Sequence, residues 1–230
     1  MALSDAFRTL SLIAALNALV ATGVLAQDAN PAQHADLAAA LQSAGEGEVV
    51  LAELEKIAPF DESDLSRAYR EERFETLLNL IRAEGGVCND DGGTHAPNPV
   101  RIASNAQLND AAFDHAKYLA EERKRIKAAG SPNPHTQTLT DSPLFTGQKM
   151  GDRASHAGYT GFNNAESIAS GNGNDVAGDS IKMWFNSRAG HCSGLFRSDI
   201  DEFGFGAMNY INDEFHNNNE FKSVYMTGRE

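Results

Sequence analysis

Positive charge is scarce in this 230-residue chain, in which 19 Lys and Arg residues stand against 32 Asp and Glu residues. The formal net charge of −13 repels phosphate backbones, so the composition disfavours nucleic-acid binding. Neutral molecules, cations and metal ions are the partners that this charge favours. The 41% of hydrophobic residues and 22% of charged residues are typical of a globular protein and exclude a collagen, a coiled coil or a multi-span membrane protein.

Long hydrophobic runs are also missing after the N-terminus. The single strongly apolar stretch, Leu10–Val24, has the length of a signal-peptide core and ends in small residues that suit cleavage after Ala26. We therefore expect a signal peptide over 1–26, a secreted or periplasmic product and no transmembrane span once the signal is removed. The alternative is an uncleaved membrane anchor, although the run is shorter than the ~20 apolar residues that a span needs.

Cysteine is nearly absent as well, with only Cys88 and Cys192 in the chain. In an exported protein, two cysteines indicate one disulfide bond, which would close a loop of roughly 100 residues. The alternative is that Cys192, which follows His191, serves as a thiolate ligand or nucleophile.

Hydrophobic periodicity predicts helices in the first part of the chain and strands in the last third. Phe74, Leu77, Leu78 and Ile81 lie on one helical face, and a second stripe begins at Leu108 after a possible N-cap, Asn105. His115 lies on that second apolar face, where we interpret it as a core residue. A third helix begins after Asp175. Strand-like pieces follow at 203–208 and 223–227, which indicates an α+β domain.

The segment before this domain carries no chemical motif. Residues 27–65 are rich in Ala, Glu and Asp, with two helical patches separated by glycines. We expect an acidic helical N-terminal extension over 27–65, loosely attached, and one domain over 66–230. Near the other end, the acidic, Asn-rich stretch 213–220 lacks the spacing of a calcium loop and is interpreted as a solvated hairpin.

Six pieces of the chain carry a further pattern: Leu77–Gly85, Leu108–Ala116, Gly151–Tyr159, Ala165–Ala169, Trp184–Cys192 and Phe203–Gly206. In this order they resemble the bacterial form of the CAP superfamily (cysteine-rich secretory proteins, antigen 5 and pathogenesis-related 1), also called SCP-like domains. They are similar to the family's opening helix, its second helix, the turn before a central Glu, its G-E-N-I-A segment, its W-x-x-S-x-x-G-H segment and its G-x-G strand.

The resemblance implies a three-layer α-β-α sandwich and a cleft that gathers two histidines and acidic residues. Matched position by position, the cleft residues are His135, Glu166 and His191. Ser187 occupies the place of a second Glu in many animal and plant members, so this chain lacks one of the two carboxylates. A bacterial subgroup with cysteines at the places of Cys88 and Cys192 supports their pairing.

Two imidazoles are suitable ligands for Zn²⁺ or another divalent metal, so His135 and His191 are candidate metal ligands. Glu166, the candidate catalytic residue, has three possible roles: to ligate the metal, to orient a histidine or to act as general base on bound water. The chain has no H-E-x-x-H pair that would present two ligands from one helix.

Three functions of different classes follow from these residues. The first is an exported binding protein for a small molecule, lipid, metal ion or cell-envelope partner, which we expect to be non-enzymatic. The second is a metal-dependent hydrolase, a protease or peptidoglycan-acting enzyme, using the same cleft. The third is a structural domain in which His135 and His191 lie apart.

Overall fold

The computed structural model describes residues 30–229, apart from 44–45, 91, 131 and 213–216. The expected signal peptide therefore lies outside the described residues. The helices are α2 (Pro31–Gln42), α3 (Gly47–Ile57), α4 (Arg67–Glu84), α5 (Ala106–Glu121), α6 (Arg123–Ala128), α7 (Met150–His156), α8 (Val176–Phe185) and α9 (His191–Leu195). The strands are β1 (Gly86–Val87), β2 (Thr94–His95), β3 (Ala103–Ser104), β4 (Phe162–Asn172), β5 (Glu202–Asn212) and β6 (Asn217–Arg229).

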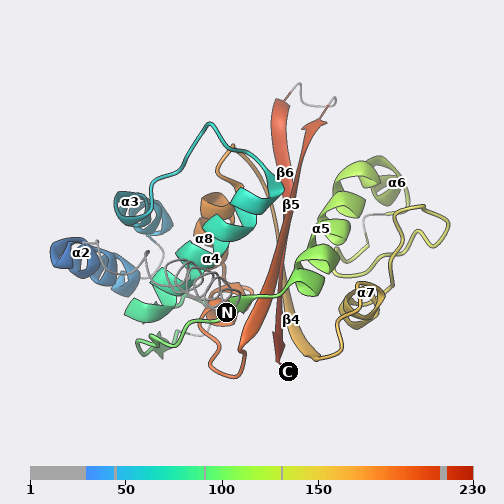
Figure 1. Ribbon diagram of the computed structural model, residues 1–230. Coiled ribbons are helices and arrows are strands. Elements are labelled where there is room, and N and C mark those ends of the chain that lie inside the picture. The colour runs from blue at the N-terminus through green and yellow to red at the C-terminus, as the bar shows by residue number, and fades with distance from the viewer. Residues whose placement is uncertain (1–29, 44–45, 91, 131, 213–216, 230) are drawn as a thin grey trace, which may run out of the picture.

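The molecule has three layers, with a central sheet between two groups of helices (Figure 1). The sheet has the strand order β3-β5-β6-β4, in which β3 is parallel to β5 and the other pairs are antiparallel. Helices α2, α3, α4 and α8 lie on one side of the sheet, and α5, α6 and α7 lie on the other (Figure 1). This is the α+β sandwich that the sequence predicts.

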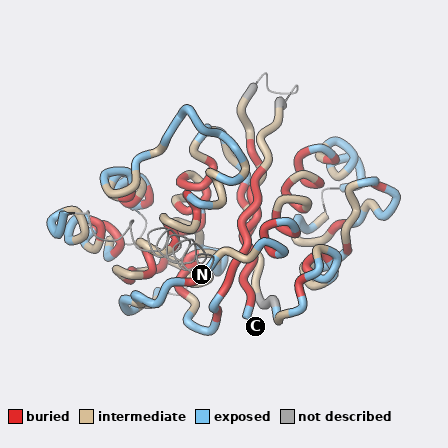
Figure 2. The backbone as a smooth tube through the Cα atoms, in the orientation of Figure 1, coloured by how far each residue is buried: buried red, intermediate tan, exposed pale blue. Residues whose placement is uncertain are grey.

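Both faces of the sheet are buried by these helices, as the buried inner strands in Figure 2 show. On one face, Phe203 and Phe205 are fully buried with the α4 side chain Phe74, whose ring stacks on Phe205 at 4.2 Å between centroids. On the other face, Gly204 and Gly206 let α5 approach closely, because a Cβ on either glycine would lie within 2.5 Å of the α5 backbone. The alternating Phe-Gly-Phe-Gly segment thus sets how closely the helical layer on each face approaches the sheet.

Two helices begin where the sequence predicts. Asn105 accepts hydrogen bonds from the backbone at the start of α5, and Asp175 accepts one at the start of α8. The strands are longer than the predicted pieces 203–208 and 223–227: β5 extends to Asn212, and β6 begins at Asn217 within the polar stretch. Strand pairing depends on hydrogen bonds between backbone N–H and C=O groups, which form whatever the polarity of the side chains. Residue composition therefore underestimates the length of these strands.

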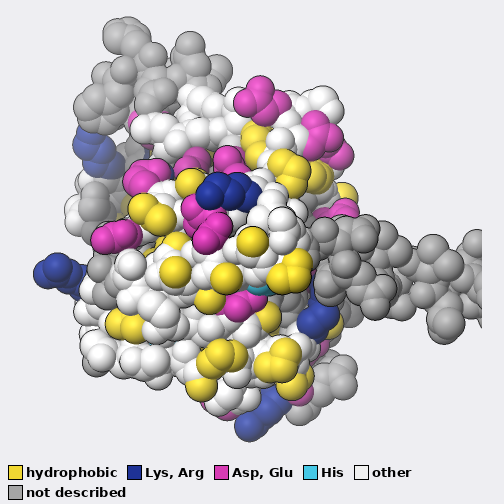
Figure 3. Space-filling model, turned by 90° about the vertical axis from the view of Figure 1, so that its left-hand side faces the viewer, with side chains coloured by type: hydrophobic (Ala, Val, Ile, Leu, Met, Phe, Trp, Pro, Cys, Tyr) yellow, Lys and Arg dark blue, Asp and Glu magenta, His cyan; other side chains and the backbone are white. Residues whose placement is uncertain are grey.

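The N-terminal extension is firmly packed against the domain rather than loosely attached. Leu37 and Leu41 of α2, with Val50 and Leu54 of α3, are fully buried and belong to the core beneath α4 and α8. Arg73 of α4 also donates to the Ala58 carbonyl after α3 and binds the Asp175 carboxylate through two nitrogens. The outer face on the side of α2 and α3 carries scattered acidic side chains and few cations (Figure 3).

Cys88 and Cys192 form the expected disulfide bond, and both side chains are fully buried. This excludes a free Cys192 thiolate as ligand or nucleophile in the oxidised protein. The bond joins the end of β1 to α9, which are 104 residues apart in sequence. Within the described part of the chain, none of the helices is long and apolar enough to cross a membrane.

We predict that replacing both cysteines with serine lowers the free energy of unfolding by about 4 kcal/mol, because the unfolded chain regains the entropy of a long loop. Urea unfolding of the variant and of oxidised wild type measures the difference. Wild type reduced with a phosphine should match the variant. If reduced and oxidised wild type unfold at the same urea concentration, the crosslink does not stabilise the fold.

Candidate functional site

Three of the four predicted cleft residues, His135, Glu166 and His191, line one hollow at the open edge of strand β4. The hollow has a volume of about 320 Å³ and is lined by His135, Ala165, Glu166, Ser167, Ala189, Gly190, His191, Ser193, Gly194 and Arg197. Successive side chains of a strand point to opposite faces of the sheet. Because three consecutive β4 residues line the hollow, it touches both faces and therefore lies at the sheet edge, between the two helical layers.

Glu166 is held from two directions at this edge. Its side chain is 4% exposed, and the Arg153 guanidinium of α7, which is fully buried, contacts Oε2 at 2.5 Å. His135 Nδ1 lies 2.9 Å from Oε1. Burial raises the pKa of Glu166, but the hydrogen bond from His135 and the contact with Arg153 outweigh it, so the pKa lies below the usual value. Glu166 is therefore ionised at neutral pH, and both oxygens are engaged.

This contact fixes the proton arrangement of His135. An ionised carboxylate only accepts hydrogen bonds, so Nδ1 of His135 carries the proton and donates it to Glu166. In the neutral form of this tautomer, Nε2 carries the lone pair. The His135 side chain is 39% exposed, which leaves that nitrogen accessible from the hollow. Glu166 acts here as the group that orients the histidine, one of the three roles considered above.

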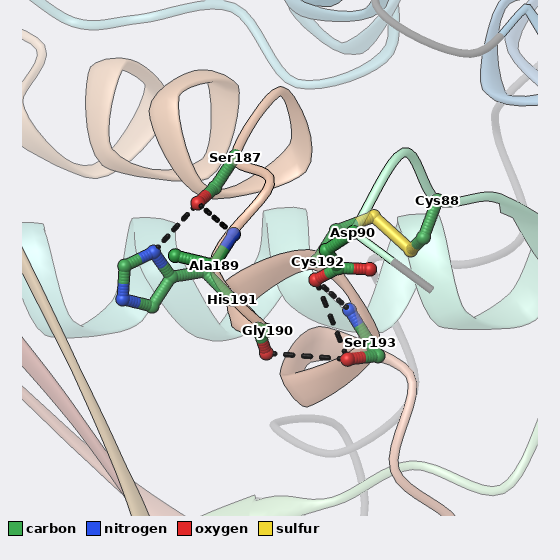
Figure 4. The surroundings of a disulfide bond; sticks show 8 residues. All are labelled: Cys88, Asp90, Ser187, Ala189, Gly190, His191, Cys192 and Ser193. Carbon is green, nitrogen blue, oxygen red and sulfur yellow. Dashed lines mark hydrogen bonds between the residues drawn. A yellow bond between two sulfur atoms is a disulfide. The ribbon is translucent and has the colours of Figure 1, made fainter. Parts of the chain in front are cut away.

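His191 belongs to the opposite helical layer. Its Nδ1 lies 2.9 Å from Ser187 Oγ, which also accepts the Ala189 N–H. Figure 4 shows the His191 ring directed away from the disulfide that its neighbour Cys192 forms. Burial and the nearby His135 lower the pKa of His191, which favours the neutral ring. Ser187, the fourth predicted cleft residue, thus orients His191 and is not itself among the residues that line the hollow.

The backbone that carries His191 is anchored on both sides. Asp90 accepts hydrogen bonds from the backbone N–H and the hydroxyl of Ser193, next to the disulfide (Figure 4). Arg82 of α4 is buried and donates to the carbonyls of Leu195 and Arg197 at 3.0 and 2.6 Å. These bonds and the crosslink fix α9 to the layer beneath it.

The loop that carries His135 rests on His115, the core residue predicted from the apolar stripe of α5. His115 is fully buried and donates from Nε2 to the Pro134 carbonyl at 2.9 Å, while its Nδ1 accepts from Gln137 at 3.1 Å. Gln137 in turn accepts the Thr146 N–H. Burial, with the charge of Arg153, lowers the pKa of His115 to about 4. His115 is therefore neutral and supports the loop.

Sequence reasoning missed Arg153 and Arg197. Arg153 lies inside the Gly151–Tyr159 piece that was singled out as a turn, but a single arginine in a helix carries no signal of the carboxylate it will meet. Arg197 lines the hollow and binds Asp199 through Nε and Nη2. It follows α9 in a segment without periodicity, so only the folded chain reveals its position.

Two imidazole nitrogens are the groups in the hollow that could hold a metal ion. In the tautomer in which His191 donates from Nδ1 to Ser187, Nε2 is free to ligate, as it is in His135. Among the described residues, the group of three possible ligand atoms within 4.8 Å of one another is Cys88, Asp90 and Cys192, and the disulfide occupies both sulfurs. His135, Glu166 and His191 do not form such a group of three, so a metal ion in the hollow would rest on the two imidazoles, with water or a ligand at its other positions.

We predict that Arg153→Met lowers the free energy of unfolding by ~3–5 kcal/mol, since it leaves the buried Glu166 carboxylate without its cation. Chemical denaturation at pH 7 measures this. Adding Glu166→Gln to Arg153→Met should restore part of the loss, because the remaining amide is uncharged. A double variant that is less stable than Arg153→Met would contradict the assigned ion pair.

We also predict that His115 makes the fold sensitive to acid. Its pKa of about 4 in the folded state lies below the ordinary value of 6.5, so the unfolded chain binds a proton first as the pH falls. Protonation of His115 in the unfolded chain lowers the free energy of unfolding by roughly 3 kcal/mol as the pH falls from 6.5 to 4. Above pH 6.5 His115 is neutral in both states, and this effect is absent. Unfolding free energies of wild type and His115→Gln across this range test it. Parallel pH curves for the two proteins would refute the prediction.

Comparison with known proteins gives one similar solved structure. No family model and no curated protein matches the chain. The fold is similar to that of an extracellular protein containing an SCP domain from Bacillus anthracis str. Ames, with a TM-score of 0.42 and 14% sequence identity. The similarity covers 78% of this chain and 43% of that one, so this chain spans less than half of its length.

Proposed function

We propose that the protein is an exported CAP-type binding protein whose hollow holds a divalent cation, with Zn²⁺ as the best-suited ion. His135 and His191 are the ligands, each through Nε2. Glu166 and Ser187 orient the two rings from behind. The observation that carries this proposal is that two histidines from opposite helical layers, 56 positions apart in the sequence, line one hollow with their Nδ1 atoms already engaged.

The electrostatics of the hollow support a cation at neutral pH. The lowered pKa of His191 keeps a lone pair available on its ring. Glu166 remains ionised behind His135, and a carboxylate in that position makes the imidazole a stronger donor. A bound metal would supply Lewis acidity to a water or ligand group at its remaining positions. Export is supported by the disulfide and by the apolar run near the N-terminus.

Binding is better supported than hydrolysis. A general base must have an oxygen free to take a proton, but both oxygens of Glu166 are engaged by His135 and Arg153. Ser187 stands where many family members have a second carboxylate, so this chain lacks the second acid–base group. The hydroxyl of Ser193 donates to Asp90 and Gly190 rather than to a histidine. We therefore assign the cleft to binding.

We predict one equivalent of Zn²⁺ per chain in untagged protein, measured by isothermal titration calorimetry and elemental analysis. His135→Ala and His191→Ala should each weaken binding at least tenfold, because each removes a ligand. Glu166→Gln should weaken it by about 10–100-fold through loss of ring orientation. His156→Ala, on the exposed surface of α7, is the matched control and should bind like wild type. Equal affinity in all four variants would exclude this site.

A further inference from the structure

Strand β4 forms one edge of the sheet over its whole length of 11 residues. It pairs with β6 on one side, from Phe162 opposite Arg229 to Asn172 opposite Glu220. Among the described residues, the backbone of Ala165–Gly171 forms its hydrogen bonds with β6 and with no other segment. An antiparallel edge strand directs the N–H and C=O groups of alternate residues away from its neighbour, so β4 presents a row of donors and acceptors outward.

This edge lacks most features that block strand pairing in other proteins. Exposed edges are commonly protected by lysine, proline, inward charges, bulges or a covering segment. The β4 sequence contains no Lys, Arg or Pro, and its single charged residue, Glu166, is engaged by Arg153 and His135. The ladder has one irregularity, between Asn163 and Ala165, near the start of the strand. From Ala165 to Gly171 the register is regular, and the edge can accept a further strand.

The hollow lies along this same edge and has two walls. His135 belongs to the wall on the α7 side, and His191 and Arg197 belong to the wall on the α9 side. A strand added to β4 would direct successive side chains to the two walls in turn. One set would face His135, and the other would face His191 and Arg197.

We propose that the open edge of β4 binds an extended peptide by strand addition, with its side chains alternating between the two walls of the hollow. A polypeptide is the occupant that supplies alternating N–H and C=O groups at the spacing of a strand, which neither a lipid nor a glycan does. Pairing uses the β4 backbone, so this proposal goes beyond the metal site and does not need it.

The first experiment selects binders from a phage-displayed library of random dodecapeptides on the immobilised full-length protein. Each selected peptide is also synthesised as two variants, one N-methylated at its odd-numbered residues and the other at its even-numbered residues. One variant loses the N–H donors that face β4 and should bind at least tenfold more weakly, while the other keeps them and should bind like the parent peptide. Equal binding by both variants, or a library without binders, overturns the proposal.

The second experiment locates the peptide by hydrogen exchange. In the free protein, alternate amides between Ala165 and Gly171 should exchange rapidly, and the peptide should protect them. Protection elsewhere, or a β4 edge already protected by dimerisation of the protein, overturns the proposal. Protein variants give a further check, because one of Ser167→Pro and Ile168→Pro removes only an outward N–H. The variant that retains the wild-type melting temperature should lose peptide binding.

The peptide and metal proposals fail separately. Peptide binding is measured in EDTA, where no divalent cation is available, and we expect it to persist. If EDTA abolishes peptide binding, the backbone edge is not the binding element. Zinc binding in the absence of peptide tests the metal site alone.

Discussion

A buried carboxylate stands where the three layers of the fold meet. Glu166 extends from the edge strand of the sheet, and Arg153 reaches it from α7 while His135 reaches it from the preceding loop. An ionised carboxylate at this depth is stable only if charged or polar groups compensate for the water it has lost. The position of α7, the proton arrangement of His135 and the shape of one wall of the hollow all depend on this compensation.

The other wall is held by different means. A disulfide, the Asp90–Ser193 contact and the Arg82 bonds to two carbonyls fix α9, which presents His191. Neither wall contributes a complete site, because each layer supplies one imidazole. The sheet edge brings them together, and it also leaves a row of backbone groups unpaired between them. A cation between the histidines and a peptide along the strand would therefore use the same space in different ways.

Local sequence signals predicted the parts of the fold that depend on short-range physics. The apolar face of α4 is buried at Phe74, Leu77, Leu78 and Ile81, and Asn105 and Asp175 cap the helices that they were expected to begin. Local sequence signals failed where contacts between segments far apart in the chain decide the structure. The polar ends of β5 and β6 join the sheet because each satisfies the backbone of the other. The extension was expected to be loosely attached, yet Leu37 and Leu54 are buried because α4 and α8 offer them a surface.

The sequence by itself supplied the cleft candidates His135, Glu166, His191 and Ser187 through the resemblance of its segments to SCP-like domains, matched position by position. Helix periodicity, capping and cysteine number, which are local or countable properties, predicted helices and a disulfide bond but did not name these cleft residues. Only the tertiary structure decided what each residue does. Arg153 occupies one oxygen of Glu166, so that residue orients a histidine and is not a free base. The hollow lies at an unpaired strand edge, since strand order depends on contacts between segments far apart in the chain.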